Sequence, residues 1–201
     1  MPPQCVVRPA QTAGPYFVDD MLDRSDLRSD PTDGTVNPGV PLALTVAVSR
    51  LAGNACEPMP RVQVDLWHCD HQGVYSGVKD PAFDTEGRKF LRGFQVTDAQ
   101  GLARFTTIYP GWYPGRAVHI HFKLRSRPPR QPGFDFTSQL YFDDALSDRI
   151  YADARYAGRG SAATRNADDG IFRQGGDQLL LALTPGAGGY AGTFHLALQG
   201  V

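Results

Sequence analysis

Apolar and polar residues alternate along most of this chain in short segments, and few segments show the three-to-four-residue spacing of an amphipathic helix. Gly, Pro, Asp and Asn separate these segments, which is typical of strands joined by turns and loops. Eight such segments predict an all-β fold, a two-sheet β-sandwich. The expected strands are Val40–Leu51, Arg61–Cys69, Leu91–Thr97, Gly101–Ile108, Ala117–Arg125, Phe136–Phe142, Gln178–Thr184 and Tyr190–Leu198.

The connections between these segments differ greatly in length. Thr97–Gly101 reads "TDAQG", and its Asp and Gly predict a tight hairpin turn. Residues 1–38, Ser76–Lys89 and Asp143–Asp177 are long and irregular, with a short helix expected at Asp143–Asp153. Long loops on a rigid sandwich are the usual place for a functional site. We therefore expect one domain over residues 1–201, whose long loops carry the site and whose residues 1–38 form an arm lining it.

The charge balance argues against two classes of partner. Twenty basic and twenty-one acidic residues give a formal charge of -1, so no overall field attracts nucleic acid or anionic lipid. No apolar run approaches the roughly 20 residues that span a bilayer, and the first residues lack the order of a signal peptide. We expect a soluble protein without nucleic-acid or membrane partners. The compartment stays open, because an exported domain without its leader has the same sequence features.

The three cysteines, Cys5, Cys56 and Cys69, are too far apart for a C-x-x-C zinc or redox motif. A disulfide between Cys56 and Cys69 is geometrically possible, and so are three reduced, mostly buried thiols. A bridge would indicate an oxidising compartment.

A His-x-His pair lies in the expected strand Ala117–Arg125. Side chains alternate between the two faces of a strand, so His119 and His121 point the same way, while Val118, Ile120 and Phe122 face an apolar layer. Two imidazoles that converge on one point suggest a metal site.

The residues alone leave the metal open. A third imidazole from His68, His71 or His195 would give a site like those of zinc hydrolases. A cupin-type iron(II) site requires a nearby carboxylate, whereas the sequence after the pair, "HIHFKLRSR", offers only bases. Tyr113 precedes the strand in a Pro/Gly turn, and a phenolate beside imidazoles favours a trivalent ion such as Fe(III). Tyr109 is expected to pack in the turn or to wall the site.

Four ordered motifs carry a resemblance to a known family. The segment "TIYPGWYPGRAVHIHF" resembles the iron-binding signature of the intradiol ring-cleavage dioxygenases, the family of protocatechuate 3,4-dioxygenase and catechol 1,2-dioxygenase. "VDLWHCDHQGVYSG" is similar to the segment that carries the first iron tyrosine of this family. "QTAGPYF" resembles the N-terminal segment that lines the substrate pocket, and "TSQLYF" the strand with an active-site glutamine. Together they span most of the chain.

The resemblance implies a specific site. It makes one non-haem Fe(III) per chain the cofactor, with hydroxide or water as a fifth ligand. Its four protein ligands are Tyr75, Tyr113, His119 and His121. Tyr113 corresponds to the ligand that leaves when substrate binds, and Arg116 and Gln139 correspond to the other catalytic residues. The implied reaction cleaves a catechol with O2 between its two hydroxyl-bearing carbons, giving a muconate-type diacid.

The resemblance also suggests the substrate wall, formed by Thr12, Gly14, Pro15, Tyr16, Trp112 and Arg116. Whether Tyr16 contacts a substrate carboxylate, which would favour protocatechuate, stays open. Only five residues separate Tyr113 from His119, fewer than in the best-known members, so a more open site and a broad substrate range are expected. The chain lacks the helical N-terminal extension through which catechol 1,2-dioxygenases dimerise, so we expect a monomer or weak homo-oligomer. The alternative from another class is a non-catalytic, transthyretin-like binding module, which predicts no iron.

Overall fold

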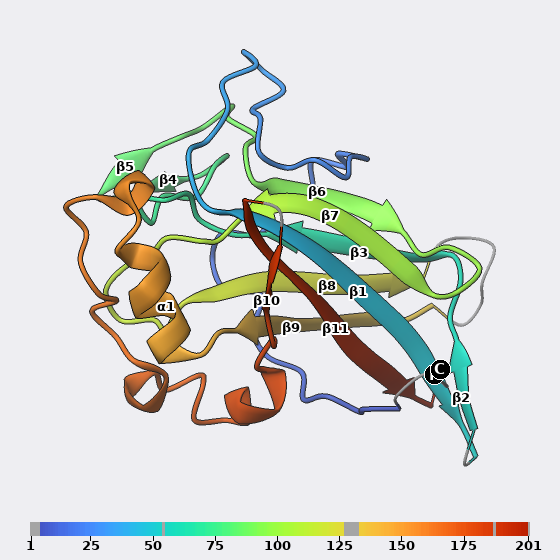
Figure 1. The fold of residues 1–201 in the computed structure, drawn as a ribbon. Coiled ribbons are helices and arrows are strands. Elements are labelled where there is room, and N and C mark those ends of the chain that lie inside the picture. Colours follow the sequence, from blue (N-terminus) through green and yellow to red (C-terminus); the bar gives the residue numbers. More distant parts are fainter. Residues whose placement is uncertain (1–4, 54, 127–132, 187, 201) are drawn as a thin grey trace.

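Two β-sheets packed face to face form the molecule (Figure 1). The computed structural model describes residues 5–53, 55–126, 133–186 and 188–200. In the first sheet, strands follow the order β10 (Thr184–Gly186), β11 (Gly189–Gln199), β1 (Pro41–Ala52) and β2 (Ala55–Pro58), and β7 (Leu102–Ile108) also pairs with β1. In the second, the order is β6 (Arg92–Val96), β3 (Val62–Trp67), β8 (His119–Ser126) and β9 (Asp135–Tyr141). The predicted two-sheet β-sandwich is confirmed.

The inner faces of the two sheets enclose the main hydrophobic core. In β8 the apolar positions Ile120 and Phe122 are fully buried in this core, where Phe122 meets Phe194 of β11 with ring centroids 5.6 Å apart. The two histidines between and before them project from the opposite face, as the alternation predicted. The same two-residue period that builds the core therefore places His119 and His121 side by side outside it.

The middle of the N-terminal arm, residues 11–24, covers the outer face of the second sheet, whereas Val7 and Asp26 form bridges with β11 and β7 of the first sheet. Phe17 packs edge-on against Trp67 of β3 at a centroid distance of 4.9 Å. Arg125 of β8 joins the arm to the sheet through ion pairs with Asp19 and Asp65, both at 2.7 Å. The described part of the arm forms only isolated bridges with neighbouring strands. Its predicted irregularity is confirmed for residues 5–38, and residues 1–4 lie outside the described part.

The two ends of the sandwich carry different elements (Figure 1). The helix α1 (Asp144–Tyr151) and the small hairpin β4 (Lys79–Asp80) and β5 (Phe83–Asp84) lie at one end, and β2 lies at the other. The carboxylate of Asp143 accepts the Leu146 N–H at 2.8 Å and caps the helix, whose prediction is confirmed. Three short 3-10 helices follow: η1 (Ala154–Tyr156), η2 (Asn166–Asp168) and η3 (Gly176–Leu179).

The predicted strand Gln178–Thr184 is wrong. Its first residues belong to η3, and the segment meets β9 at a single bridge, where the Leu181 N–H donates to the Tyr141 carbonyl at 2.8 Å. Leu179 and Leu181 are buried and Leu180 is exposed, which reproduces the alternation of a strand. The apolar alternation reflects burial of this segment against β9, the edge strand of the second sheet. After the single bridge the segment turns away from β9, so no further backbone hydrogen bonds form between them.

The predicted hairpin at Thr97–Gly101 is also wrong in its pairing. The turn itself exists, because the Gly101 N–H donates to the Asp98 carbonyl at 2.9 Å. However, β6 before it pairs with β3, whereas β7 after it pairs with β1 in the other sheet. The segment is a crossing between the layers, and local turn residues do not specify which neighbours the flanking strands take.

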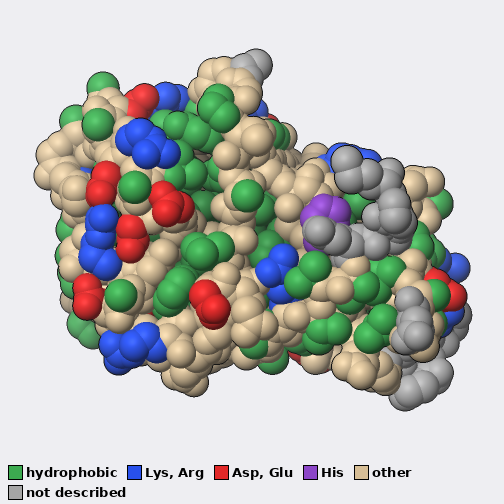
Figure 2. Space-filling model, turned by 60° about the horizontal axis from the view of Figure 1, so that its bottom comes forward, with side chains coloured by type: hydrophobic (Ala, Val, Ile, Leu, Met, Phe, Trp, Pro, Cys, Tyr) green, Lys and Arg blue, Asp and Glu red, His purple; other side chains and the backbone are tan. Residues whose placement is uncertain are grey.

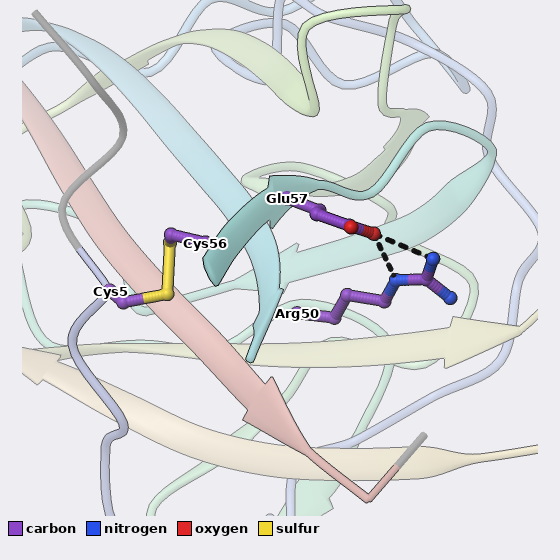
Figure 3. Close-up of a disulfide and its surroundings, with 4 residues drawn as sticks. All are labelled: Cys5, Arg50, Cys56 and Glu57. Carbon is purple, nitrogen blue, oxygen red and sulfur yellow. Dashed lines mark hydrogen bonds and ion pairs between the residues drawn. A yellow bond between two sulfur atoms is a disulfide. The ribbon is translucent and has the colours of Figure 1, made fainter. Parts of the chain in front are cut away.

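A disulfide joins Cys5 of the arm to Cys56 of β2, with the two Cα atoms 5.4 Å apart (Figure 3). The bridge considered between Cys56 and Cys69 is therefore wrong, and so is the set of three reduced thiols. The whole of β3 lies between Cys56 and Cys69 in the chain, and the sulfur of Cys56 is already bonded to that of Cys5. Cys69 is a buried free thiol whose Sγ lies 3.4 Å from the Gly111 carbonyl oxygen, and burial raises its pKa.

Acidic and basic side chains are mixed on the face shown in Figure 2, with hydrophobic side chains scattered among them. None of the helices in the described part of the chain has the length and apolar character needed to span a bilayer.

Candidate metal centre and active site

Four side chains meet at the end of the sandwich where β3 ends and β8 begins. The Nε2 atoms of His119 and His121 lie 3.0 Å apart. The hydroxyl oxygen of Tyr113 lies 3.2 Å from His119 Nε2, and that of Tyr75 lies 3.4 Å from the same atom. Two imidazole nitrogens and two phenol oxygens from three chain segments thus converge on one point.

The loop that carries Tyr75 is held by its own turn. The Asp70 carboxylate accepts the N–H groups of Gln72 and Val74 at 2.8 and 2.9 Å, which folds the chain back after β3. Gly73 has a φ of +87°, a conformation that glycine adopts without strain. The Thr85 hydroxyl then donates to the Tyr75 carbonyl at 2.6 Å, so the loop is fixed from both sides.

The two histidines are suited to bind a metal in their neutral form. The Nδ1 atom of His119 lies 2.6 Å from the Ala117 carbonyl, which makes Nδ1 the protonated nitrogen and leaves the Nε2 lone pair facing the cluster. Burial, with a smaller contribution from the Arg116 charge, lowers the pKa of His119 to about 3. Burial also lowers the pKa of His121 well below the ordinary value. The Nδ1 atom of His121 is buried and has no hydrogen-bond partner in the described structure.

The two tyrosines add hard oxygen donors to this set. Burial raises the pKa of Tyr75 and of Tyr113, so both phenols are neutral while no cation lies between them. A bound cation reverses this balance, because its charge stabilises the phenolate. Anionic oxygen beside imidazole is a donor set that a trivalent ion prefers, so the residues present fit Fe(III).

The structure does not form the three-histidine site of the zinc alternative. His68 is buried with its ring nitrogens 2.7 Å from the Thr107 hydroxyl and 2.8 Å from the Cys69 carbonyl. His195 lies on β11 in the other sheet. Within the described ranges, no three side chains of His, Cys, Asp or Glu gather so that they could hold a metal ion. The structure therefore brings no third imidazole, from His68, His71 or His195, to the His-x-His pair.

Arg116 lies beside the cluster in a fixed orientation. Its Nε donates to the Asp169 carboxylate at 3.0 Å, and its terminal nitrogen donates to the side-chain oxygen of Gln139 and, at 3.3 Å, to the Tyr141 hydroxyl. Asp169 also accepts the Ala117 N–H at 2.9 Å. Burial by itself raises the pKa of Asp169, but the hydrogen bond from Ala117 and the Arg116 charge outweigh it and bring the pKa below its usual value.

Gln139 joins this network to the N-terminal arm. It faces His121 across the β8–β9 ladder, and its amide donates to the Thr12 carbonyl at 2.9 Å. The Tyr141 hydroxyl donates to the Gln11 side chain at 2.8 Å. Gln11, Tyr141 and Asp169 were not among the site residues predicted from the sequence. Tyr141 is two residues from Gln139 on the same strand, so alternation could have found it, whereas no local pattern marks Asp169.

The expected substrate wall is only partly assembled around the cluster. A Cβ atom on Gly14 would lie 3.4 Å from the His121 ring, so the arm passes directly over that histidine. Tyr16 stacks on Tyr75 with centroids 4.5 Å apart. Pro15 is exposed. Trp112 turns toward another loop, where its indole N–H donates to the Gly160 carbonyl at 3.2 Å and the Arg159 guanidinium lies 4.4 Å from its ring centroid.

Tyr109, which has no ligand role in the family signature, is fully buried in the core. Its hydroxyl lies 2.7 Å from the Ser147 hydroxyl of α1, and its ring packs against Phe142. The expectation that it packs the turn is confirmed.

Known dioxygenases are similar to this chain in sequence and in fold. A family model described as dioxygenase matches residues 12–170. A segment of 111 residues is 33% identical to the protocatechuate 3,4-dioxygenase beta chain of Burkholderia cepacia, covering 51% of this chain and 47% of that protein. The matched region thus spans about half the length of this curated relative.

Solved structures match over nearly the whole chain. An intradiol ring-cleavage dioxygenase from Tetranychus urticae superposes with a TM-score of 0.83 at 29% identity, covering 97% of this chain and 95% of that one. The dioxygenase domain of a dioxygenase and carbohydrate-binding protein fusion from a Streptomyces species gives 0.68 at 31% identity, covering 96% and 99%. Because the family model spans most of the chain and the fold agrees throughout, the chain belongs to the intradiol ring-cleavage dioxygenase family.

Proposed function

We propose that this protein is a non-haem Fe(III) dioxygenase that cleaves catechol rings between the two hydroxyl-bearing carbons to give muconate-type diacids. The observation that carries the proposal is the convergence of two phenol oxygens and two imidazole nitrogens, with His119 Nε2 at distances of 3.0 to 3.4 Å from the other three atoms. The proposed ligands are Tyr75, Tyr113, His119 and His121, with one iron per chain.

When bound, Fe(III) supplies a Lewis acid that a catechol chelates through both oxygens and that makes the ring reactive toward O2. The two tyrosines differ in how easily they can be displaced. Tyr75 is 1% exposed and stacked under Tyr16, whereas Tyr113 is only partly buried and comes from a Pro/Gly loop. We assign to Tyr113 the role of the ligand that gives way to substrate and accepts one of its two protons.

Arg116 and Gln139 supply preorganised electrostatics in this proposal. The guanidinium is oriented by Asp169 before any substrate arrives, so its positive charge is available to negative charge developing on the ring and oxygens at no reorganisation cost. The Gln139 amide orients the same group through its own hydrogen bonds. Trp67, stacked flat on His121 at 5.0 Å, and Phe17 behind it exclude water from the buried side.

The ligand set is tested by metal content and colour. Purified protein is expected to hold about one iron per chain and to show the broad visible band of tyrosinate bound to Fe(III). Tyr75→Phe should weaken and shift this band, because Tyr113 remains as a phenolate ligand, whereas Tyr190→Phe, which changes a tyrosine on β11, should leave it unchanged. Colourless protein with zinc or no metal after reconstitution with iron would contradict the proposal.

The reaction is tested by oxygen uptake with a panel of catechols and by separating the products. A muconate-type diacid containing both atoms of labelled O2 is the expected product. An extradiol semialdehyde, or no oxygen uptake by the iron-loaded protein with any catechol, would overturn the assigned reaction.

A further inference from the structure

A carboxylate lies one tyrosine ring away from the proposed ligands. Tyr16 of the N-terminal arm stacks on Tyr75 with an interplanar angle of 24°, and its edge meets Tyr113 at a centroid distance of 6.5 Å. Its hydroxyl donates to Asp80 Oδ2 at 2.8 Å. The hydrogen-bonding end of the ring that covers the site is therefore already occupied by an acid from β4.

Asp80 is held as an anion. Its second oxygen accepts the Ala82 N–H at 2.9 Å, and this bond, followed by the one from Tyr16, keeps the pKa of Asp80 below its usual value. No described lysine or arginine forms an ion pair with Asp80. The adjacent Lys79 pairs with Asp84 instead, at 3.3 Å. Two neutral donors, the Ala82 N–H and the Tyr16 hydroxyl, thus stabilise the negative charge of Asp80, and no described cationic side chain neutralises it.

Three described arginines touch residues around the site, and each donates to an acceptor within the chain. Arg116 is paired with Asp169 at 3.0 Å. Arg92 is 3% exposed and donates to the carbonyls of Tyr16 and Ser76 on the backbone side of the arm, away from the Tyr16 hydroxyl. Arg159 donates to the Trp112 carbonyl. Arg116 and Arg92 thus already donate to acceptors within the chain, whereas Arg159 lies against the Trp112 ring with its Nε buried without a partner in the described structure.

We propose that the Asp80–Tyr16 pair is a specificity determinant that selects uncharged catechols over catechols bearing an anionic ring substituent. The inference rests on the proposed function, because it places the catechol ring at the cluster beside Tyr16. A carboxylate on that ring meets the negative charge of Asp80, and it finds the Tyr16 hydroxyl already donating to Asp80. An alkyl, halogen or hydroxyl substituent carries no such penalty.

The test compares kcat/KM for catechol, 4-methylcatechol and protocatechuate in the iron-loaded protein. The wild type is expected to prefer 4-methylcatechol over protocatechuate by about tenfold or more. Asp80→Asn keeps an acceptor for Tyr16 and removes the charge, so the preference should fall by about three- to tenfold. The matched control Asp84→Asn, on the same hairpin and paired outward with Lys79, should leave the preference unchanged.

Ionic strength provides a second readout. Because Asp80 is close to solvent, the wild-type preference should shrink as salt is raised from 0.01 to 1 M, where the Debye length falls from roughly 30 to 3 Å. The Asp80→Asn preference should respond much less. Thermal unfolding of both variants checks that each is folded.

The outcomes separate the two proposals. An unchanged preference in Asp80→Asn, or a wild-type preference for protocatechuate that disappears in Tyr16→Phe, overturns the specificity inference alone. If no catechol is turned over, the proposed function fails, and anaerobic calorimetry with the same three catechols then measures the preference as binding. Equal affinities of wild type and Asp80→Asn for protocatechuate, relative to 4-methylcatechol, overturn the inference there too.

Discussion

The two ends of the sandwich are held together in different ways. At the β2 end, the Cys5–Cys56 disulfide ties the start of the arm to the first sheet, next to the exposed ion pair of Arg50 and Glu57 (Figure 3). At the α1 end, hydrogen bonds, ion pairs and ring packing hold the four converging side chains. A disulfide reduces the conformational freedom of the unfolded chain but does not orient side chains at the opposite end of the sandwich, whereas the site depends on many short contacts. The comparison predicts that changes at the two ends affect different properties.

The largest effect is expected from His119→Ala. Removing the imidazole that lies within 3.4 Å of three other donors should abolish iron binding and oxygen uptake, with a loss of more than about 100-fold. Iron analysis and oxygen-electrode assays measure this. His195→Ala on β11 should retain iron, and an active, iron-loaded His119→Ala protein would remove this residue from the ligand set.

Breaking the disulfide by Cys5→Ser should act on stability and spare the site. The bridge closes a loop of 51 residues, and losing it should lower the free energy of unfolding by about 2–4 kcal/mol. Urea unfolding of the metal-free protein measures the change. Iron content and kcat of the folded protein should stay within about twofold. A large loss of activity without a loss of stability would mean that the disulfide end also orients the site. Arg50→Ala, at the same exposed end, should change stability by less than about 1 kcal/mol.

The site end should be the acid-sensitive one, and His68 tests this away from the ligands. Burial lowers its pKa to about 4, so between pH 6.5 and 4 the unfolded chain binds a proton that the folded chain does not. The contribution of His68 to the free energy of unfolding is therefore complete above pH 6.5. It is lost as the pH falls toward 4, which lowers that free energy by about 2–3 kcal/mol. Unfolding free energies of metal-free protein across this range measure the loss. His68→Gln should flatten the dependence, and an unchanged slope in that variant would assign it to other groups.

A smaller effect is expected from Asp169→Asn. The variant keeps a side-chain oxygen near Ala117 but removes the charge that orients Arg116, so kcat/KM should fall by about tenfold while iron and colour are retained. Asp168→Asn, the exposed neighbour, is the matched control. If Asp169→Asn also loses iron, Asp169 supports the metal centre itself and not only the guanidinium.

Several parts of the fold were readable from the sequence because they depend on local alternation. Seven of the eight expected strands occur, and the two-residue period placed His119 and His121 on one face. Gln178–Thr184 shows the limit of this signal, because burial alternates there without a neighbouring ladder. The turn at Thr97–Gly101 shows another limit, because turn chemistry fixes a reversal and not the partner strands.

The sequence by itself determined the sandwich, the histidine pair and, through its resemblance to a family, the four candidate ligands. Only the tertiary structure decided that Cys5 is the partner of Cys56, that Asp169 orients Arg116 and that Tyr16 donates to Asp80. These pairs are separated by 51, 53 and 64 residues. Alternation reports which face a side chain takes along its own strand, whereas the packing of loops and sheets decides what it meets from elsewhere in the chain.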